Sequence, residues 1–192
     1  AMAAVGMALE LPRGAGLVCS LVAIGLLWFV LPRTANSANG LYVVFAVTGL
    51  LGLGLGPMLN AYMTFLPNGG QLIMTALGGT ALIFASLSAY VLTTKKDFSF
   101  MGGFLMTGVM VLLFVSLGAV VASLFGVALS GVFLAISAAS MMLFSALILF
   151  DTSRIIHGGE TSYINATISL YLDILNIFTS LLHLLGFASN DD

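Results

Sequence analysis

The sequence predicts an all-α fold, a polytopic transmembrane helix bundle of seven helices of which the first is only partly present. Of the 192 residues, 60% are hydrophobic and 6% are charged, whereas soluble domains carry about 25% charged residues. Apolar stretches long enough for the hydrocarbon core, which needs about 20 helical residues, recur along the whole chain. Short stretches rich in glycine, proline or polar residues separate them. We therefore expect residues 1–192 to form a single transmembrane domain.

The first apolar stretch, Ala1–Leu9, is too short to cross a hydrocarbon core. We expect it to be the end of a longer helix whose beginning and N-terminal tail are missing, and Pro12 to stop it. Pro32 is expected to end the next helix, and Pro57 to interrupt the one after that. Six full spans are predicted: Gly14–Leu31, Gly40–Leu66, Gln71–Leu92, Phe98–Leu124, Val127–Ile156 and Tyr163–Phe187.

The last predicted span carries a row of polar residues on an otherwise apolar helix. Steps of three and four residues place the members of this row on one helix face. Such a face cannot point toward lipid, so it must face other helices or a wet cavity. The row consists of Asn165, Ser169, Asp173, Asn176, Ser180 and His183.

Two aspartates lie inside the last two predicted spans. At 1.5 Å per residue, Asp151 lies about 8 Å before the end of its span and Asp173 about 15 Å after the start of the next. A short connection makes these helices antiparallel, so both carboxyl groups fall in the same half of the membrane. If they meet there, they cannot both ionise cheaply and would share one proton, acting as a pH-sensing pair.

An alternative assigns these charges to ordinary structural roles. Asp151 would pair with Arg154 three residues later on the same helix. Asp173 would belong to a buried polar network. Under either interpretation the supporting polar residues are Arg154, Asn165, Ser169, Asn176 and Ser180. Ionisable groups inside a membrane are functional more often than not, which favours the pH-sensing pair.

Catalytic functions fit the sequence less well. Intramembrane aspartyl proteases use two aspartates on neighbouring helices, in YD and GxGD motifs, whereas this chain has FDTS and YLDI. The sequence also lacks the GxSxG turn of a serine hydrolase. A net charge of −2 without a basic run argues against nucleic acid as a partner. We therefore predict a protein that is not an enzyme.

Metal and cofactor sites have few candidate ligands. The single cysteine, Cys19, allows neither an internal disulfide nor a cysteine-ligated cluster. His183 lies about 30 Å along the last helix from its start, too far to share a metal with His157 and Glu160. Asp151 and Asp173 offer at most a weak calcium site, because calcium takes six to eight oxygen ligands. No other cofactor is expected.

Two segments resemble the Bax inhibitor family of membrane proteins: ALGGTALIFASLSAYVLTTKKDFSFMGGFLMTG (Ala76–Gly108), and the region around FDTSRIIHGGE. The likeness covers nearly the whole chain. The resemblance implies a seven-helix fold whose last helix is central and enclosed by the other six. It also implies an acidic pair between helices six and seven, here Asp151 and Asp173, which in relatives is tied to a pH-sensitive calcium leak.

The same resemblance implies a function and a partner. Bacterial members include a modulator of the membrane protease FtsH, so we expect a bacterial inner-membrane protein that binds and modulates FtsH. The alternative is a calcium or cation leak gated by the aspartate pair; the two are compatible. Contact with FtsH inside the bilayer would use small residues, which let helices approach closely. The candidates are Gly52, Gly56, Gly103 and Gly108, although packing inside the bundle is the role that the sequence favours for them.

The distribution of basic residues predicts the orientation. With the N-terminus in the cytoplasm, the cytoplasmic loops hold four basic residues: Arg33, Lys95, Lys96 and Arg154. The opposite side holds only Arg13. Because lysine and arginine favour the cytoplasmic side, the C-terminal Asp192 is expected in the periplasm. A re-entrant last segment would instead return that tail to the cytoplasm.

Overall fold

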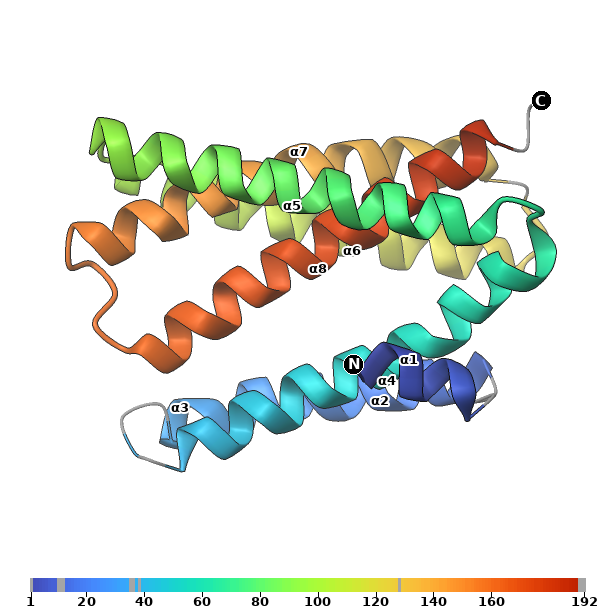
Figure 1. Cartoon of the computed structure of the whole chain (residues 1–192), viewed down its shortest axis with the longest axis horizontal. Helices are drawn as coiled ribbons and strands as arrows, with labels where there is room; N and C mark the ends of the chain where they lie inside the picture. The colour runs from blue at the N-terminus through green and yellow to red at the C-terminus, as the bar shows by residue number, and fades with distance from the viewer. Residues whose placement is uncertain (1, 10–12, 35–36, 38, 128, 190–192) are drawn as a thin grey trace. The chain divides into compact units, whose positions relative to one another are not determined.

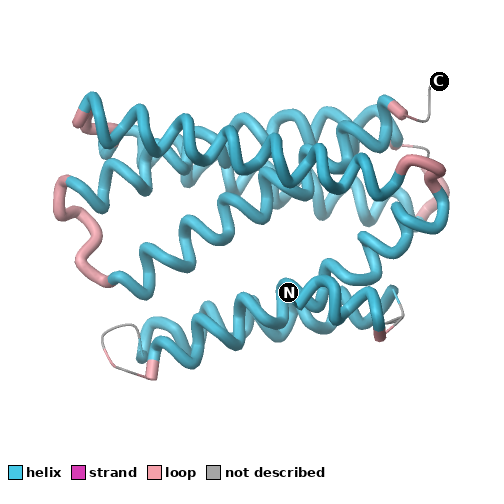
Figure 2. The backbone as a smooth tube through the Cα atoms, viewed as in Figure 1, coloured by secondary structure: helices cyan, strands magenta, loops and turns pink. Residues whose placement is uncertain are grey.

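A computed structural model describes residues 2–9, 13–34, 37, 39–127 and 129–189, and these residues are helical almost throughout, with no strand (Figure 1). Short connections join the helices (Figure 2). Six helical segments of the described chain are long and apolar enough to cross a membrane. The all-α transmembrane class is therefore confirmed. Pro12 and Asp192, on which two predictions depend, lie outside the described residues.

The helices follow the predicted spans closely, within a few residues at each end. The short first helix is α1, and α2, a π-helix and α3 form one continuous helical run. The bounds are α1 Met2–Ala8, α2 Arg13–Gly25, the π-helix Leu26–Val30, α3 Leu31–Thr34, α4 Gly40–Phe65, α5 Gly69–Thr94, a 3₁₀-helix Ser99–Met101, α6 Gly102–Leu124, α7 Ser130–Ile156 and α8 Tyr163–Ala188.

The helical run passes through Pro32 and continues to Thr34, one residue beyond Arg33, where the sequence places its end. The π-helical turn lies directly before the proline, and the N–H of Leu31 donates to the carbonyl of Leu26, five residues earlier. Proline lacks an N–H and its ring collides with the preceding turn of an α-helix. A wider turn at that point relieves the collision. Pro57 likewise does not break α4, in keeping with the tolerance of transmembrane helices for proline.

The chain divides into two compact units, and α8 contributes to both of them. The first unit comprises Ala1–Ile73 and Ser162–Tyr171. In it, α1 and α2 both pack against α4. A Cβ at Gly6 of α1 would lie 2.6 Å from the carbonyl oxygen of Leu53 and 3.2 Å from the Cα of Gly56. Only glycine allows backbones to approach this closely.

The second unit comprises Met74–Thr161 and Leu172–Asp192. Within it, α6 packs against α7, and the buried side chains include Leu105 and Ile148. A Cβ at Gly79 of α5 would meet the side chain of Leu181 of α8 at 2.7 Å. Among the six spans of the described chain, α8 has the largest share of buried residues. This burial suits a helix with a polar face that must avoid lipid.

Candidate functional site

The site lies in the second unit, where α7 and α8 bring Asp151 and Asp173 together. The side chain of Asp173 is 4% exposed. The two carboxyl groups interact electrostatically and through a side-chain hydrogen bond. Ionised carboxylates only accept hydrogen bonds, so a bond between the two needs a proton on one of them. The meeting of the two aspartates expected from helix geometry is thus present in the structure.

One oxygen of the pair is left without a protein partner. The Oδ2 atom of Asp173 is buried and makes no hydrogen bond within the described structure. A buried polar atom in this state costs free energy, and such exceptions mark strained or functional positions. Asp173 is therefore the residue of the pair that carries a buried oxygen without a hydrogen-bond partner in the described structure.

The connection between α7 and α8 sets the geometry of the pair. The N–H groups of Gly159 and Glu160 donate to the carbonyl oxygen of Arg154 at 2.8 and 3.2 Å, which closes the last turn of α7. Gly158 adopts the left-handed conformation, with φ of 75°, as a helix C-terminus of this kind requires. This glycine therefore ends α7.

A serine cap starts α8 on the other side of the connection. The Oγ of Ser162 accepts the N–H of Asn165 at 3.4 Å, the usual arrangement at a helix N-terminus. Two well-defined helix ends separated by a few residues hold α7 and α8 antiparallel. Asp151 and Asp173 thereby lie in the halves of α7 and α8 that are nearer to this connection.

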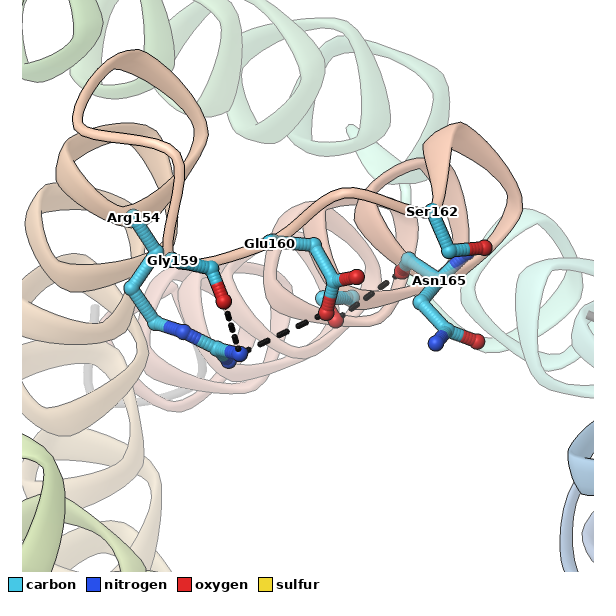
Figure 3. A network of polar contacts seen from close by, with 6 residues as sticks. Arg154, Gly159, Glu160, Ser162 and Asn165 are labelled. Carbon is cyan, nitrogen blue, oxygen red and sulfur yellow. Dashed lines mark hydrogen bonds and ion pairs between the residues drawn. The ribbon is translucent and has the colours of Figure 1, made fainter.

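Arg154 stabilises the connection between the two helices. Its guanidinium donates to the carbonyl oxygen of Gly159 at 3.1 Å and to the Oε2 atom of Glu160 at 3.4 Å (Figure 3). It also lies over the ring of Phe150, 5.4 Å from the centroid. The ion pair that sequence analysis considered for Arg154 was with Asp151. The structure shows one with Glu160, which fixes the loop that positions the aspartates.

The rest of the polar row on α8 is satisfied mainly within the helix. The hydroxyl of Ser169 donates to the carbonyl of Asn165 at 3.0 Å, and the amide of Asn176 donates to the carbonyl of Leu172 at 2.8 Å. Ser180 is buried. Side chains that bond to their own helix need no partner on a neighbour. Asp173, by contrast, interacts with Asp151 of α7.

Sequence reasoning missed a second polar cluster at the end of α7. Ser153 is fully buried, and its Oγ accepts the N–H of Phe98 from the connection between α5 and α6 at 2.9 Å. His157, one turn later, reaches the carbonyl of Lys95 in the same connection. The sequence offers two signals of this cluster: Ser153 and His157 are four residues apart, and a basic loop lies elsewhere in the chain. Nothing local in the sequence pairs that loop with α7.

The described residues contain no group of three or more histidine, cysteine or acidic side chains able to hold a metal. The aspartate pair supplies two carboxyl groups, against the six to eight oxygen atoms that calcium prefers. The site is polar, and its buried member, Asp173, lies beside Asp151 of the neighbouring helix.

This fold and site define a class: a multi-pass helical membrane protein with a buried acidic pair between its last two helices. The sequence profile of the family described as "Inhibitor of apoptosis-promoting Bax1" matches residues 1–190. The chain therefore belongs to this family, and the resemblance seen in the sequence is confirmed.

Individual relatives share about half of their residues with this chain. A protein of Escherichia coli strain K12 named "Modulator of FtsH protease YccA" is 52% identical, over 92% of this chain and 77% of its own length. Its counterpart in E. coli O6:H1, with the same identity and coverage, is named "Inner membrane protein YccA". A membrane protein of Vibrio cholerae serotype O1 is 50% identical, over 97% of this chain and 81% of its own.

Proposed function

We propose that this protein is an inner-membrane regulator that binds an FtsH protease and modulates its activity. The observation that carries the proposal is the 52% identity to a protein named a modulator of FtsH protease, which extends over 92% of the chain. The match covers most of the chain rather than one segment of it. A shared mode of action is the simplest consequence.

The contact with FtsH would lie within the bilayer, and the structure narrows the candidate surface. Of the four glycines expected to face outward, Gly56 is packed against Gly6 of α1, and Gly52 against Met2. A Cβ at Gly108 would meet the side chain of Leu143 at 2.7 Å. These contacts support packing inside the bundle, the role that the sequence favours, for these three. A glycine that packs against another part of its own bundle is covered, so it cannot also pack against a helix of FtsH.

Gly103 is the remaining candidate, because a Cβ there would meet nothing within 4 Å. A Gly103→Leu substitution should leave the fold intact and reduce co-purification of FtsH from membranes. The matched control is Gly118→Leu, on the same helix about 22 Å away, where a Cβ also meets nothing. Equal binding by both variants and the unmodified protein would exclude Gly103 from the interface. Equal loss in both would indicate a general disturbance of α6.

The proposal as a whole is tested by isolating the protein from membranes under conditions that preserve complexes. FtsH should co-purify, and its degradation of a membrane substrate in vesicles should change when the protein is added. A protein that neither retains FtsH nor changes the degradation rate would overturn the proposal. Both readouts are needed, because binding alone does not show modulation.

We further infer a cytoplasmic N-terminus and a periplasmic C-terminus. Lys95 and Lys96 are exposed in the loop outside the apolar spans, and Arg33 and Arg154 lie in the last turns of α3 and α7. Basic residues near span ends favour the cytoplasmic side. A reporter fused after the last residue should be active only in the periplasm. Cytoplasmic activity would favour the re-entrant alternative.

A second candidate function is a pH-sensitive calcium or cation leak, favoured specifically by the orphaned oxygen of Asp173 beside Asp151. Loss of the shared proton would add a second buried negative charge, and repulsion would push α7 and α8 apart. Calcium would be the passing ion. Flux into liposomes should then depend on pH and become less pH-dependent in Asp151→Asn and Asp173→Asn variants.

A further inference from the structure

The loop after α5, residues Lys95–Phe98, is held in an unusual conformation. Lys95 has φ of 51°, in the left-handed region that side chains other than glycine rarely adopt. Its N–H donates to the carbonyl of Val91 at 2.8 Å and so ends α5. Glycine normally occupies this position because it adopts the conformation without strain. A lysine there needs contacts from outside the loop to hold it.

The end of α7 supplies those contacts. The buried Ser153 accepts the N–H of Phe98 at 2.9 Å. The Nε2 atom of His157 lies 3.2 Å from the carbonyl oxygen of Lys95, and its Nδ1 atom lies 2.9 Å from the carbonyl oxygen of Ser153. One histidine thus spans from the last turn of α7 to the strained residue of the loop.

The hydrogen-bond partners of the His157 ring indicate which protonation state the ring adopts in this arrangement. Both ring nitrogens of His157 face carbonyl oxygens, which only accept hydrogen bonds. A neutral imidazole has one N–H and can serve one carbonyl, whereas the imidazolium has two and serves both. In the neutral ring, the lone pair of the other nitrogen would face a carbonyl oxygen.

One neutral arrangement competes with this. The Nδ1 atom of His157 could accept the hydroxyl proton of Ser153, 3.4 Å away. That contact is longer than the 2.9 Å between Nδ1 and the Ser153 carbonyl oxygen, and it would leave that oxygen facing a lone pair. The Ser153 hydroxyl also has other acceptors, since the Lys96 carbonyl and an Asp97 carboxylate oxygen each lie 3.4 Å away. The distances therefore favour the charged ring.

We propose that His157 is a proton-dependent clasp, which in its protonated form holds the Lys95–Phe98 loop against the end of α7. The clasp is closed at low pH. It weakens as pH rises and the ring loses one donor. Histidine is suited to this because its charge changes between about pH 5 and 8. The exposed ring of His157 lies beyond the apolar span and meets protons from solution directly.

The other charged groups near His157 do not account for the pH dependence that we propose for the loop. Asp97, in the loop, accepts the N–H of Ser99 at 2.8 Å, and hydrogen bonds from Ser99 lower the pKa of Asp97 below its ordinary value. Asp97 therefore stays ionised where histidine titrates, and its charge attracts the protonated ring.

Two of the three cationic residues near His157 interact with other side chains. Lys96 donates to the hydroxyl of Tyr90 at 3.3 Å. On α7 and the connection that follows it, Arg154 and Glu160 pair with each other. The Lys95 side chain is exposed and contributes its charge without a described hydrogen bond.

The test uses the full chain in lipid nanodiscs, labelled with ¹⁵N-histidine. His183→Gln leaves His157 as the single histidine, so its ring signals are assigned directly. At pH 5.5 both ring nitrogens should carry protons. Hydrogen exchange at residues 95–98, corrected for its intrinsic pH dependence, should increase several-fold between pH 5.5 and 8, the size expected for loss of one exposed charge-assisted hydrogen bond.

Three variants separate the clasp from other pH effects. His157→Gln should give loop exchange that does not change with pH, while the matched control His183→Gln should keep the full response. Asp151→Asn should also keep it, because Asp151 lies six residues earlier on α7. A neutral His157 ring at pH 5.5, or a loop response that survives in His157→Gln, would overturn the proposal.

Discussion

The α1–α4 crossing offers a sharp test of the packing argument, through Gly56→Ala. A Cβ at Gly56 would lie 2.7 Å from the Cα of Gly6 and 2.8 Å from its carbonyl oxygen, closer than real Cβ atoms approach. These atoms belong to the backbone of α1, so no side-chain rotation can relieve the collision. The helix itself must move away from α4.

The expected loss follows from two opposing terms. Overpacking costs about 1–3 kcal/mol, and a backbone collision places this site near the upper end. Replacing glycine by alanine inside a helix returns about 1 kcal/mol through helix propensity. The free energy of unfolding should therefore fall by about 2 kcal/mol in Gly56→Ala. Gly103→Ala is the matched control, because its Cβ meets nothing within 4 Å; it should gain up to about 1 kcal/mol.

The two variants should thus differ by about 3 kcal/mol, roughly a hundredfold in the unfolding equilibrium. Reversible unfolding in mixed micelles, followed by helical circular dichroism and by fluorescence of the single tryptophan, Trp28, measures this difference. A Gly56→Ala protein as stable as Gly103→Ala would refute the assigned crossing of α1 and α4. FtsH co-purification should then be compared only between variants of equal stability.

Three further predictions concern the site and its helices. Asp151→Asn and Asp173→Asn should each reduce the pH dependence of cation flux in liposomes, and an unchanged pH profile in both would exclude the pair as the sensor. Ser162→Ala should lower the free energy of unfolding by about 0.5–1 kcal/mol through loss of the α8 cap, with Ser162→Asp, which keeps a capping oxygen, restoring it. Glu160→Gln should change stability by less than about 1 kcal/mol, because the pair with Arg154 is partly exposed.

The sequence alone determined the class and the number of spans, and it placed the two aspartates on neighbouring antiparallel helices. Each of these depends on local quantities. An apolar run of sufficient length must be helical in lipid, where every backbone group needs a partner within the segment. Because the rise per residue is fixed, the depths of Asp151 and Asp173 follow from counting. A short connection leaves α7 and α8 no arrangement but antiparallel.

The tertiary structure decided which surfaces are used. Gly56 and Gly103 look alike in the sequence, yet one lies against Gly6 and the other meets nothing. The direction of a helix face depends on neighbours far along the chain, and a lipid solvent gives glycine no preference between them. The partner of Arg154 and the contact of His157 with Lys95 were likewise hidden, because hydrogen bonds between loops and helix ends form only once the helices have packed.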